Sequence, residues 1–231
     1  MLRGLIAEWP AVQSWTLDSL AASYGETPVT VARLDAGKVV WDAEKGLLHE
    51  RAPLGPFIRA LQEGGRDRYV MAPMEELPAG LGRDLAPPPY CAGAAWTMWV
   101  LWIGAAGTVS RMHRDLADNL HCQIAGRKRF TLVAPRFNGD VYPNHLWDSV
   151  PNGCRVDIEE PDFARFPRLR GVETMVADLE PGDAIYIPRW WWHHVRTVET
   201  GISANFWWAN GLRAAVVLGG DWLKRLRRIS R

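Results

Sequence analysis

The clearest pattern in the chain is a series of short apolar stretches, from about residue 96 onward, in which apolar and polar positions alternate. Such stretches, bounded by Gly, Pro, Asp and Asn, are typical of β-strands joined by turns. We predict strands at residues 97–103, 119–124, 129–133, 173–176, 184–187, 193–198 and 202–208. Short strands at this spacing favour an all-β barrel or a double-stranded jelly roll.

The part of the chain before residue 96 has a mixed pattern. We predict helices at residues 16–24 and 56–62 and a strand at residues 29–34. Thr16 is placed as an N-cap, because its hydroxyl can accept a hydrogen bond from a free backbone N–H of the first turn. Residues 73–93 are rich in Pro and Gly, and we expect them to be irregular.

Two further segments lie outside the strand pattern. Residues 134–171 form a long polar insertion, which must fold over one end of the barrel. A loop of this length in a compact domain is usually functional, often as a lid or a substrate rim. Residues 212–229 predict a C-terminal amphipathic helix, with an apolar stripe formed by Ala215, Leu218, Trp222, Leu226 and Ile229.

The apolar stripe of the C-terminal helix must be buried against the barrel or against a second chain. We therefore expect a homodimer that uses Leu218, Trp222 and Leu226 at a twofold interface. The competing interpretation is that the basic run at residues 224–231 binds an acidic partner or an RNA backbone.

Length and composition favour one domain. The chain has 231 residues, of which 48% are apolar, enough for one sizeable core. We predict a single domain over residues 1–231, with a mixed N-terminal part (1–95), a jelly-roll core (96–208) and the C-terminal helix (209–231). A formal net charge of +1 gives no overall field toward nucleic acid or a membrane surface, so a nucleic-acid partner is not expected.

Cysteine usage and hydropathy indicate the compartment. The chain has three cysteines, an odd number without metal-ligand spacing, so a disulfide framework is not expected and a reducing cytoplasm is the default. The N-terminal run lacks the long apolar stretch of a secretory signal. No window approaches the roughly 18 apolar residues of a membrane span.

Two motifs carry the candidate chemistry. His113 and Asp115 form an H-x-D motif on an extended segment, where period-two alternation puts both side chains on one face. Far downstream, a Pro-Gly-Asp turn leads into a strand, and the next strand begins with the pair His193-His194. Either motif alone can arise by chance or from core histidines. Together, two histidines and a carboxylate match the facial triad of non-haem Fe(II) oxygenases.

Residues 110–135 (SRMHRDLADNLHCQIAGRKRFTLVAP) and 179–208 (LEPGDAIYIPRWWWHHVRTVETGISANFWW) resemble the cupin-like JmjC hydroxylases, a family that includes asparaginyl hydroxylases. The similarity extends to the insertion and to the N-terminal residues. It implies a mainly β double-stranded β-helix (a jelly roll of the JmjC type) with flanking helices. It also implies an Fe(II)- and 2-oxoglutarate-dependent oxygenase, which uses O2 to hydroxylate a C–H bond of a protein or peptide side chain and releases succinate and CO2.

The resemblance assigns roles to individual residues. It makes His113, Asp115 and His193 the iron ligands, and strand parity then turns His194 to the other side. Lys128 stands where the family keeps a lysine that pairs with the distal carboxylate of 2-oxoglutarate, a charge that must be met in a dry barrel. The same alignment places four hydrogen-bond donors around the co-substrate: Tyr69, Ser110, Asn119 and Asn205.

Two residues depart from the pattern of the asparaginyl hydroxylases. His121 has the same strand parity as Asn119, at a position that is apolar in those enzymes. It is either a core histidine bonded to a neighbour or a contact of the co-substrate. Arg114 replaces an aromatic residue; it points away from the metal face, and a place at the substrate rim is open to it.

Other functions remain as alternatives. A cupin can keep the fold and a Zn or Mn ion but act as an isomerase or a binding module. Lys128 beside a complete triad argues against this alternative. A hydroxylase of modified tRNA or of a small molecule is another alternative. The near-neutral charge supplies no phosphate-binding surface beyond the C-terminal basic helix.

Overall fold

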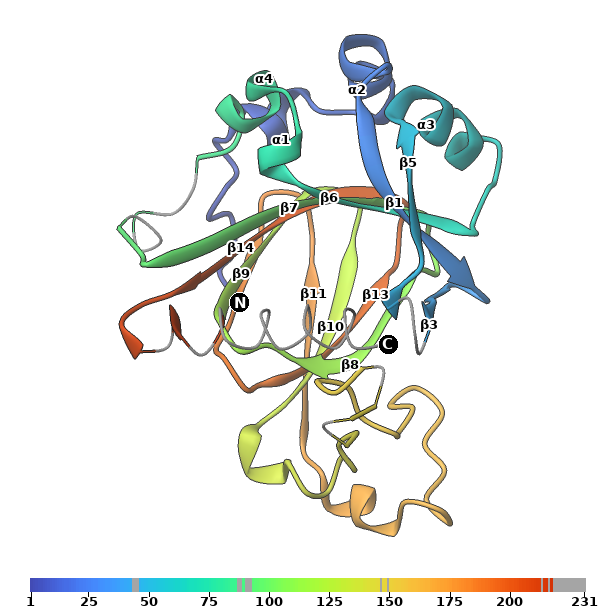
Figure 1. Ribbon diagram of the computed structural model, residues 1–231, viewed down its shortest axis with the longest axis vertical. Coiled ribbons are helices and arrows are strands. Elements are labelled where there is room, and N and C mark those ends of the chain that lie inside the picture. Colours follow the sequence, from blue (N-terminus) through green and yellow to red (C-terminus); the bar gives the residue numbers. More distant parts are fainter. Residues whose placement is uncertain are drawn as a thin grey trace.

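Two layers of antiparallel strands face each other in the computed structural model (Figure 1), and the strands form one continuous sheet by hydrogen bonding. The structure describes residues 1–42, 46–86, 89, 93–145, 147–148, 150–212, 214–215 and 217. The predicted dimer residues Leu218, Trp222 and Leu226, and most of the predicted C-terminal helix, lie outside the described residues. In the described part, no helix is long and apolar enough to cross a bilayer.

The first layer runs in the order β5, β1, β6, β7, β14, β9 and β12. The bounds of its strands are His49–Pro53 (β5), Pro28–Asp35 (β1), Arg68–Pro73 (β6), Trp96–Gly104 (β7), Gly201–Ala209 (β14), Asp118–Ala125 (β9) and Ala184–Ile187 (β12). The second layer consists of Thr174–Leu179 (β11), Lys128–Val133 (β10), Trp192–Thr197 (β13) and Val109–Arg114 (β8). The two-residue strand β2 (Lys38–Val39) joins the layers, because it pairs with both β1 and β8.

All the predicted strands are present, most of them one or two residues longer than predicted. The prediction of a mainly β fold of the jelly-roll type is therefore confirmed. Buried apolar side chains fill the space between the layers where alternation predicted them; Phe130, Leu179, Ile185 and Ile187 form one such cluster.

Four helices of the described part cover the outer face of the first layer (Figure 1): α1 (Pro10–Ser14), α2 (Leu17–Tyr24), α3 (Leu54–Gln62) and α4 (Ala79–Arg83). Thr16 caps α2 as predicted, in a capping box: its Oγ1 accepts from the Ser19 N–H at 3.0 Å, and Ser19 Oγ accepts from the Thr16 N–H at 2.8 Å. Gly25 and Gly55 let α2 and α3 approach closely, with 2.8 Å between Gly55 N and Gly25 O.

The prediction that residues 73–93 are irregular is wrong in part. They contain a 3-10 turn (η1, Met74–Glu76) and α4. Leu77 and Leu81 in this stretch are buried in the main core, so tertiary packing outweighs the local Pro and Gly content. The two-residue strands β2, β3 (Trp41–Asp42) and β4 (Gly46–Leu47) were not predicted, because two residues carry no readable alternation. The strands β5 and β6 were not predicted either, and β8 was expected only as the extended segment of the H-x-D motif.

The insertion at residues 134–171 lies across one end of the sheets (Figure 1), as predicted. It contains two 3-10 turns, η3 (Pro135–Phe137) and η4 (Pro167–Gly171). Val141, Val156, Phe166 and Leu169 build an apolar cluster with Trp192 of β13. Ion pairs of Glu159 with Arg196 and of Asp157 with Lys38 also join the insertion to β13 and β2. The insertion is therefore anchored beside the strands that carry the H-x-D motif and the histidine pair.

Candidate metal centre

The H-x-D motif and the histidine pair meet because β8 and β13 are neighbouring antiparallel strands. His193 lies directly opposite His113 in the register, and their ring centroids are 4.1 Å apart. Asp115 follows β8 immediately, and one of its carboxylate oxygens is 3.6 Å from His193 Nε2. One ligand atom from each of the three side chains lies within 4.8 Å of the other two. This spacing lets two imidazoles and a carboxylate reach a single ion.

Hydrogen bonds fix which ring nitrogens are free. Nδ1 of His113 is 2.7 Å from the Arg111 carbonyl oxygen, and Nδ1 of His193 is 3.1 Å from the Trp191 carbonyl oxygen. A carbonyl oxygen only accepts, so each Nδ1 carries the proton and each Nε2 presents a lone pair. This arrangement is the usual support of a metal-binding histidine.

The carboxylate of Asp115 is held by two N–H donors. Trp207 Nε1 donates to Oδ2 of Asp115 at 2.8 Å, and Asn119 Nδ2 donates to the same oxygen at 3.3 Å. Burial opposes ionisation, yet the pKa of Asp115 lies below its usual value, because the neighbouring histidines and the two donors favour the charged form. Burial lowers the pKa of His193 to about 4, so this imidazole is neutral at physiological pH, as a metal ligand must be.

His194 lies on the opposite side of β13. Its Nε2 is 3.8 Å from a carboxylate oxygen of Glu159 in the insertion. It does not belong to the three-residue cluster. This placement agrees with the strand parity that turned His194 to the other side from His193.

A small cavity of about 60 Å³ adjoins the triad inside the barrel. Two triad residues, His113 and His193, line it. The structure also brings to this cavity His121, whose role was left open, and the five side chains that the resemblance placed around a co-substrate: Tyr69, Ser110, Asn119, Lys128 and Asn205.

Lys128 is the charged residue at the inner end of this arrangement. It is only 3% exposed, and its Nζ donates to the Tyr69 hydroxyl at 3.0 Å and to Ser203 Oγ at 2.7 Å. In the described part of the chain, no carboxylate forms an ion pair with it. Burial lowers its pKa to about 7. A buried ammonium with only hydroxyl partners is unfavourable unless an anion joins it.

His121 belongs to a chain of polar side chains that ends at the triad. Its Nδ1 is 2.6 Å from Asn205 Oδ1, Asn205 Nδ2 donates to Asn119 Oδ1 at 2.6 Å, and Asn119 donates to Asp115. The carboxylate can only accept, which fixes the direction of every donor back to His121 Nδ1–H. Burial and the charge of Lys128 hold the pKa of His121 well below its usual value, so the ring is neutral. His121 is thus bonded to a neighbour and also lines the cavity.

Three residues of the site were not assigned a role from the sequence. Trp207 orients Asp115, Ser203 holds Lys128, and Trp102 lines the cavity with a buried Nε1 that has no hydrogen-bond partner among the described residues. Ser203 and Trp207 share the parity of Asn205 on β14. Asn205 was assigned from the family resemblance, and the strand parity that it shares with Ser203 and Trp207 was an available signal for both.

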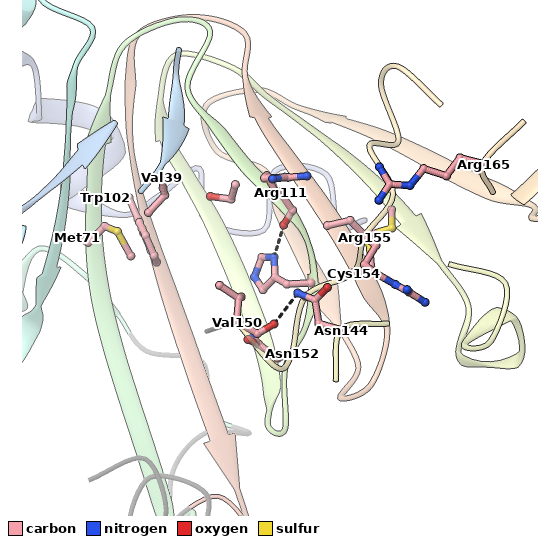
Figure 2. Close-up of a pocket in the computed structure, with 14 residues that line it drawn as sticks. Val39, Met71, Trp102, Arg111, Asn144, Val150, Asn152, Cys154, Arg155 and Arg165 are labelled. Carbon is pink, nitrogen blue, oxygen red and sulfur yellow. Dashed lines mark hydrogen bonds between the residues drawn. The ribbon is translucent and has the colours of Figure 1, made fainter. Parts of the chain in front are cut away.

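A larger groove of about 510 Å³ opens from the triad toward the insertion (Figure 2). Trp102, Ser110 and His113 line both this groove and the inner cavity, so the two spaces meet at the triad. The insertion contributes several groove residues, among them Asn144 and Cys154, which agrees with the rim expected for this segment.

Arg114 does not line the groove among the described residues. Its guanidinium lies 5.2 Å from the Trp190 ring centroid and 4.8 Å from that of Trp192, and it donates to Asn138 of the insertion. It therefore braces the insertion on the side away from the metal face. The alternative place at the substrate rim is not the one observed.

Comparisons with known proteins add the evolutionary context. A family model described as a cupin-like domain matches residues 1–213. The lysine-specific demethylase 8 of Xenopus tropicalis is 31% identical over 217 residues, which cover 90% of this chain and 47% of that protein. The Jumonji C domain-containing protein 5 of Drosophila melanogaster is 32% identical over 220 residues, with 90% and 54% covered. The bifunctional peptidase and (3S)-lysyl hydroxylase JMJD7 of Homo sapiens is 26% identical over 245 residues, with 90% and 76% covered. The chain spans about half the length of the first two relatives.

Proposed function

The chain belongs to the cupin-like domain family, and we propose that it is an Fe(II)- and 2-oxoglutarate-dependent oxygenase that hydroxylates a side chain of a protein or peptide. In this proposal His113, Asp115 and His193 hold the iron and leave its remaining positions open. With 2-oxoglutarate and O2, the iron supplies the oxidation of an unactivated C–H bond, and succinate and CO2 are released.

The observation that carries the proposal is the buried ammonium of Lys128 in the same cavity as the triad. A dicarboxylate that reaches the metal with its keto-acid end still carries a second carboxylate, which needs a cation in a water-poor interior. Lys128 offers that cation, with Tyr69 and Ser203 as its present partners. A cupin that only binds a metal has no need for a desolvated lysine.

The remaining cavity residues position the co-substrate in this proposal. The hydroxyl groups of Tyr69 and Ser110 and the amides of Asn119 and Asn205 are donors around the cavity. The Nε1–H of Trp102, which has no hydrogen-bond partner among the described residues, is a further donor. His121 acts mainly by fixing the orientation of the Asn205 amide. The polar chain from His121 to Asp115 thereby keeps the carboxylate aimed at the metal position.

A protein substrate is favoured by the groove that adjoins the triad. It has room for several side chains at about 510 Å³, and the names of two relatives, a lysine-specific demethylase and a (3S)-lysyl hydroxylase, refer to lysine chemistry. We also propose a cytoplasmic location, supported by the buried Cys154, which forms no disulfide among the described residues. A homodimer through the C-terminal helix is proposed from the apolar stripe of the sequence.

Calorimetric titration of the metal-loaded protein with two 2-oxo acids tests this proposal. Both 2-oxoglutarate and pyruvate carry the keto-acid end, but only 2-oxoglutarate has the distal carboxylate. We expect 2-oxoglutarate to bind at least about ten-fold more tightly, the effect of one charge-assisted hydrogen bond, and Fe(II) to make the protein convert it to succinate. Equal affinity for the two acids, or no succinate with Fe(II), would contradict the proposal.

A further inference from the structure

We propose that the groove beside the triad takes an acidic segment of a protein, selected by Arg111, Arg155 and Arg165. The inference rests on the proposed function, because it names the class of substrate that the same site would oxidise. Three observations support it. The charged side chains that line the groove are arginines, these arginines have no carboxylate partner among the described residues, and the opposite wall is apolar.

The charge of the groove is entirely positive on the residues that line it. Arg111 comes from β8, whereas Arg155 and Arg165 come from the insertion, so three separate positions direct arginines to one space. No aspartate or glutamate lines the groove in the described part of the chain. Burial raises the pKa of the Cys154 thiol to about 11, so this groove residue also adds no negative charge.

The three arginines have no carboxylate partner among the described residues. Asp157, which influences the same thiol, is already paired with Lys38 at 2.9 Å. The guanidinium of Arg155 lies 5.9 Å from the Tyr142 ring, and that of Arg165 lies 5.1 Å from the Phe166 ring. An arginine that packs on a ring is preorganised to bind a carboxylate with its N–H groups.

The opposite wall of the groove is apolar. Figure 2 shows Met71 and Trp102 across the groove from Arg155 and Arg165, and Val39 and Val150 also line it. A groove with an apolar wall and an arginine wall fits an extended peptide that alternates apolar and acidic side chains. A side chain of this peptide that points between the two walls reaches the junction with the inner cavity, where His113 lies.

Nucleic acid is the less suitable anion. Its binding depends on many phosphate contacts spread over a basic surface, whereas the chain has a formal net charge of +1 and eight of its arginines are already paired with carboxylates in the described part. The groove brings together three arginines that have no carboxylate partner among the described residues. A short acidic peptide matches the extent of this small group of charges.

Fluorescence anisotropy on the intact, zinc-loaded protein with 2-oxoglutarate tests the inference without turnover. The probes are a labelled peptide that alternates Glu with apolar residues, the same peptide with Lys for Glu, and a single-stranded RNA of equal length. The test variant is Arg155→Glu/Arg165→Glu, and Arg155→Gln/Arg165→Gln repeats it with neutral side chains. The matched control is Arg59→Glu on α3, an exposed arginine remote from the groove. Arg111 is left intact because it lies two residues before the candidate metal ligand His113 on the same strand, β8.

We expect the acidic peptide to bind at least about ten-fold more tightly than the basic one, since each exposed charge pair contributes about two- to five-fold. The Glu double variant should lose at least about ten-fold in affinity and the Gln double variant less, while Arg59→Glu stays within about two-fold. Equal binding of both peptides, tighter binding of the RNA, or unchanged affinity of both double variants would overturn the inference.

Succinate formation without any peptide separates this inference from the proposed function. Fe(II)-dependent succinate release together with no preference for the acidic peptide would reject the groove inference alone. Selective binding of the acidic peptide with no succinate release would reject the oxygenase instead.

Discussion

Replacing Lys128 by alanine removes the cation that the proposed co-substrate requires. The ammonium is buried, and its Nζ donates to the Tyr69 and Ser203 hydroxyls, at 3.0 Å and 2.7 Å. A charge-assisted hydrogen bond to a desolvated carboxylate contributes about 1.5–3 kcal/mol. We therefore expect the affinity for 2-oxoglutarate to fall by about ten- to hundred-fold. Metal binding should be retained, because Lys128 is not among the clustered ligand atoms.

The assay is the dependence of succinate release on 2-oxoglutarate concentration, with metal content measured on the same samples. Arg129→Ala is the matched control, because Arg129 is the next residue of β10 but points to solvent, where it pairs with Asp178 at 2.7 Å. An exposed ion pair of this kind contributes at most about 1 kcal/mol to stability, and its loss should leave co-substrate affinity unchanged. An unchanged apparent affinity in Lys128→Ala would refute the reasoning and remove Lys128 from the pocket.

Three further predictions concern pH, stability and assembly. Burial lowers the pKa of Lys128 to about 7 and a bound carboxylate raises it again, so 2-oxoglutarate affinity, measured by calorimetry, should fall as pH rises above about 7; Lys128→Arg, which stays charged, should flatten this dependence. Thr16→Ala breaks the capping box of α2 and should lower the free energy of unfolding by about 1 kcal/mol, with an unchanged urea m-value. Trp222→Glu should convert the homodimer to a monomer in light scattering, and a monomeric wild type would reject the interface.

The strands were predictable because short apolar or alternating stretches lie between turn residues. All eight predicted strands occur for this reason. The register of β8 with β13 follows only from the fold. The helix α4 was missed because its position depends on the burial of Leu81 in a segment whose composition favours turns. Tertiary packing determines this helix, and the local sequence pattern does not predict it.

The residues of the site also include some that the strand pattern could identify and others that it could not. The family resemblance selected His193, and strand parity then turned His194 to the other side; the same parity would also have grouped Ser203 and Trp207 with Asn205. The burial of Lys128 could not be predicted from the sequence pattern, because a lysine between two arginines is typical of a solvent-exposed segment. Only the family resemblance pointed to it. The arginines of the groove lie on β8 and on the insertion, and no spacing rule joins segments so far apart in the chain.

The central claim is that His113, Asp115 and His193 hold an iron that drives oxidation of 2-oxoglutarate. Its most direct test is Fe(II)-dependent succinate formation by the wild type and by two adjacent variants, His193→Ala and His194→Ala. The account predicts that His193→Ala loses more than about a hundred-fold, beyond the loss typical of a residue that only supports a ligand. His194→Ala should keep most of the activity, because its ring faces Glu159. A wild type without iron-dependent succinate, or activity retained in His193→Ala and lost in His194→Ala, would contradict the account.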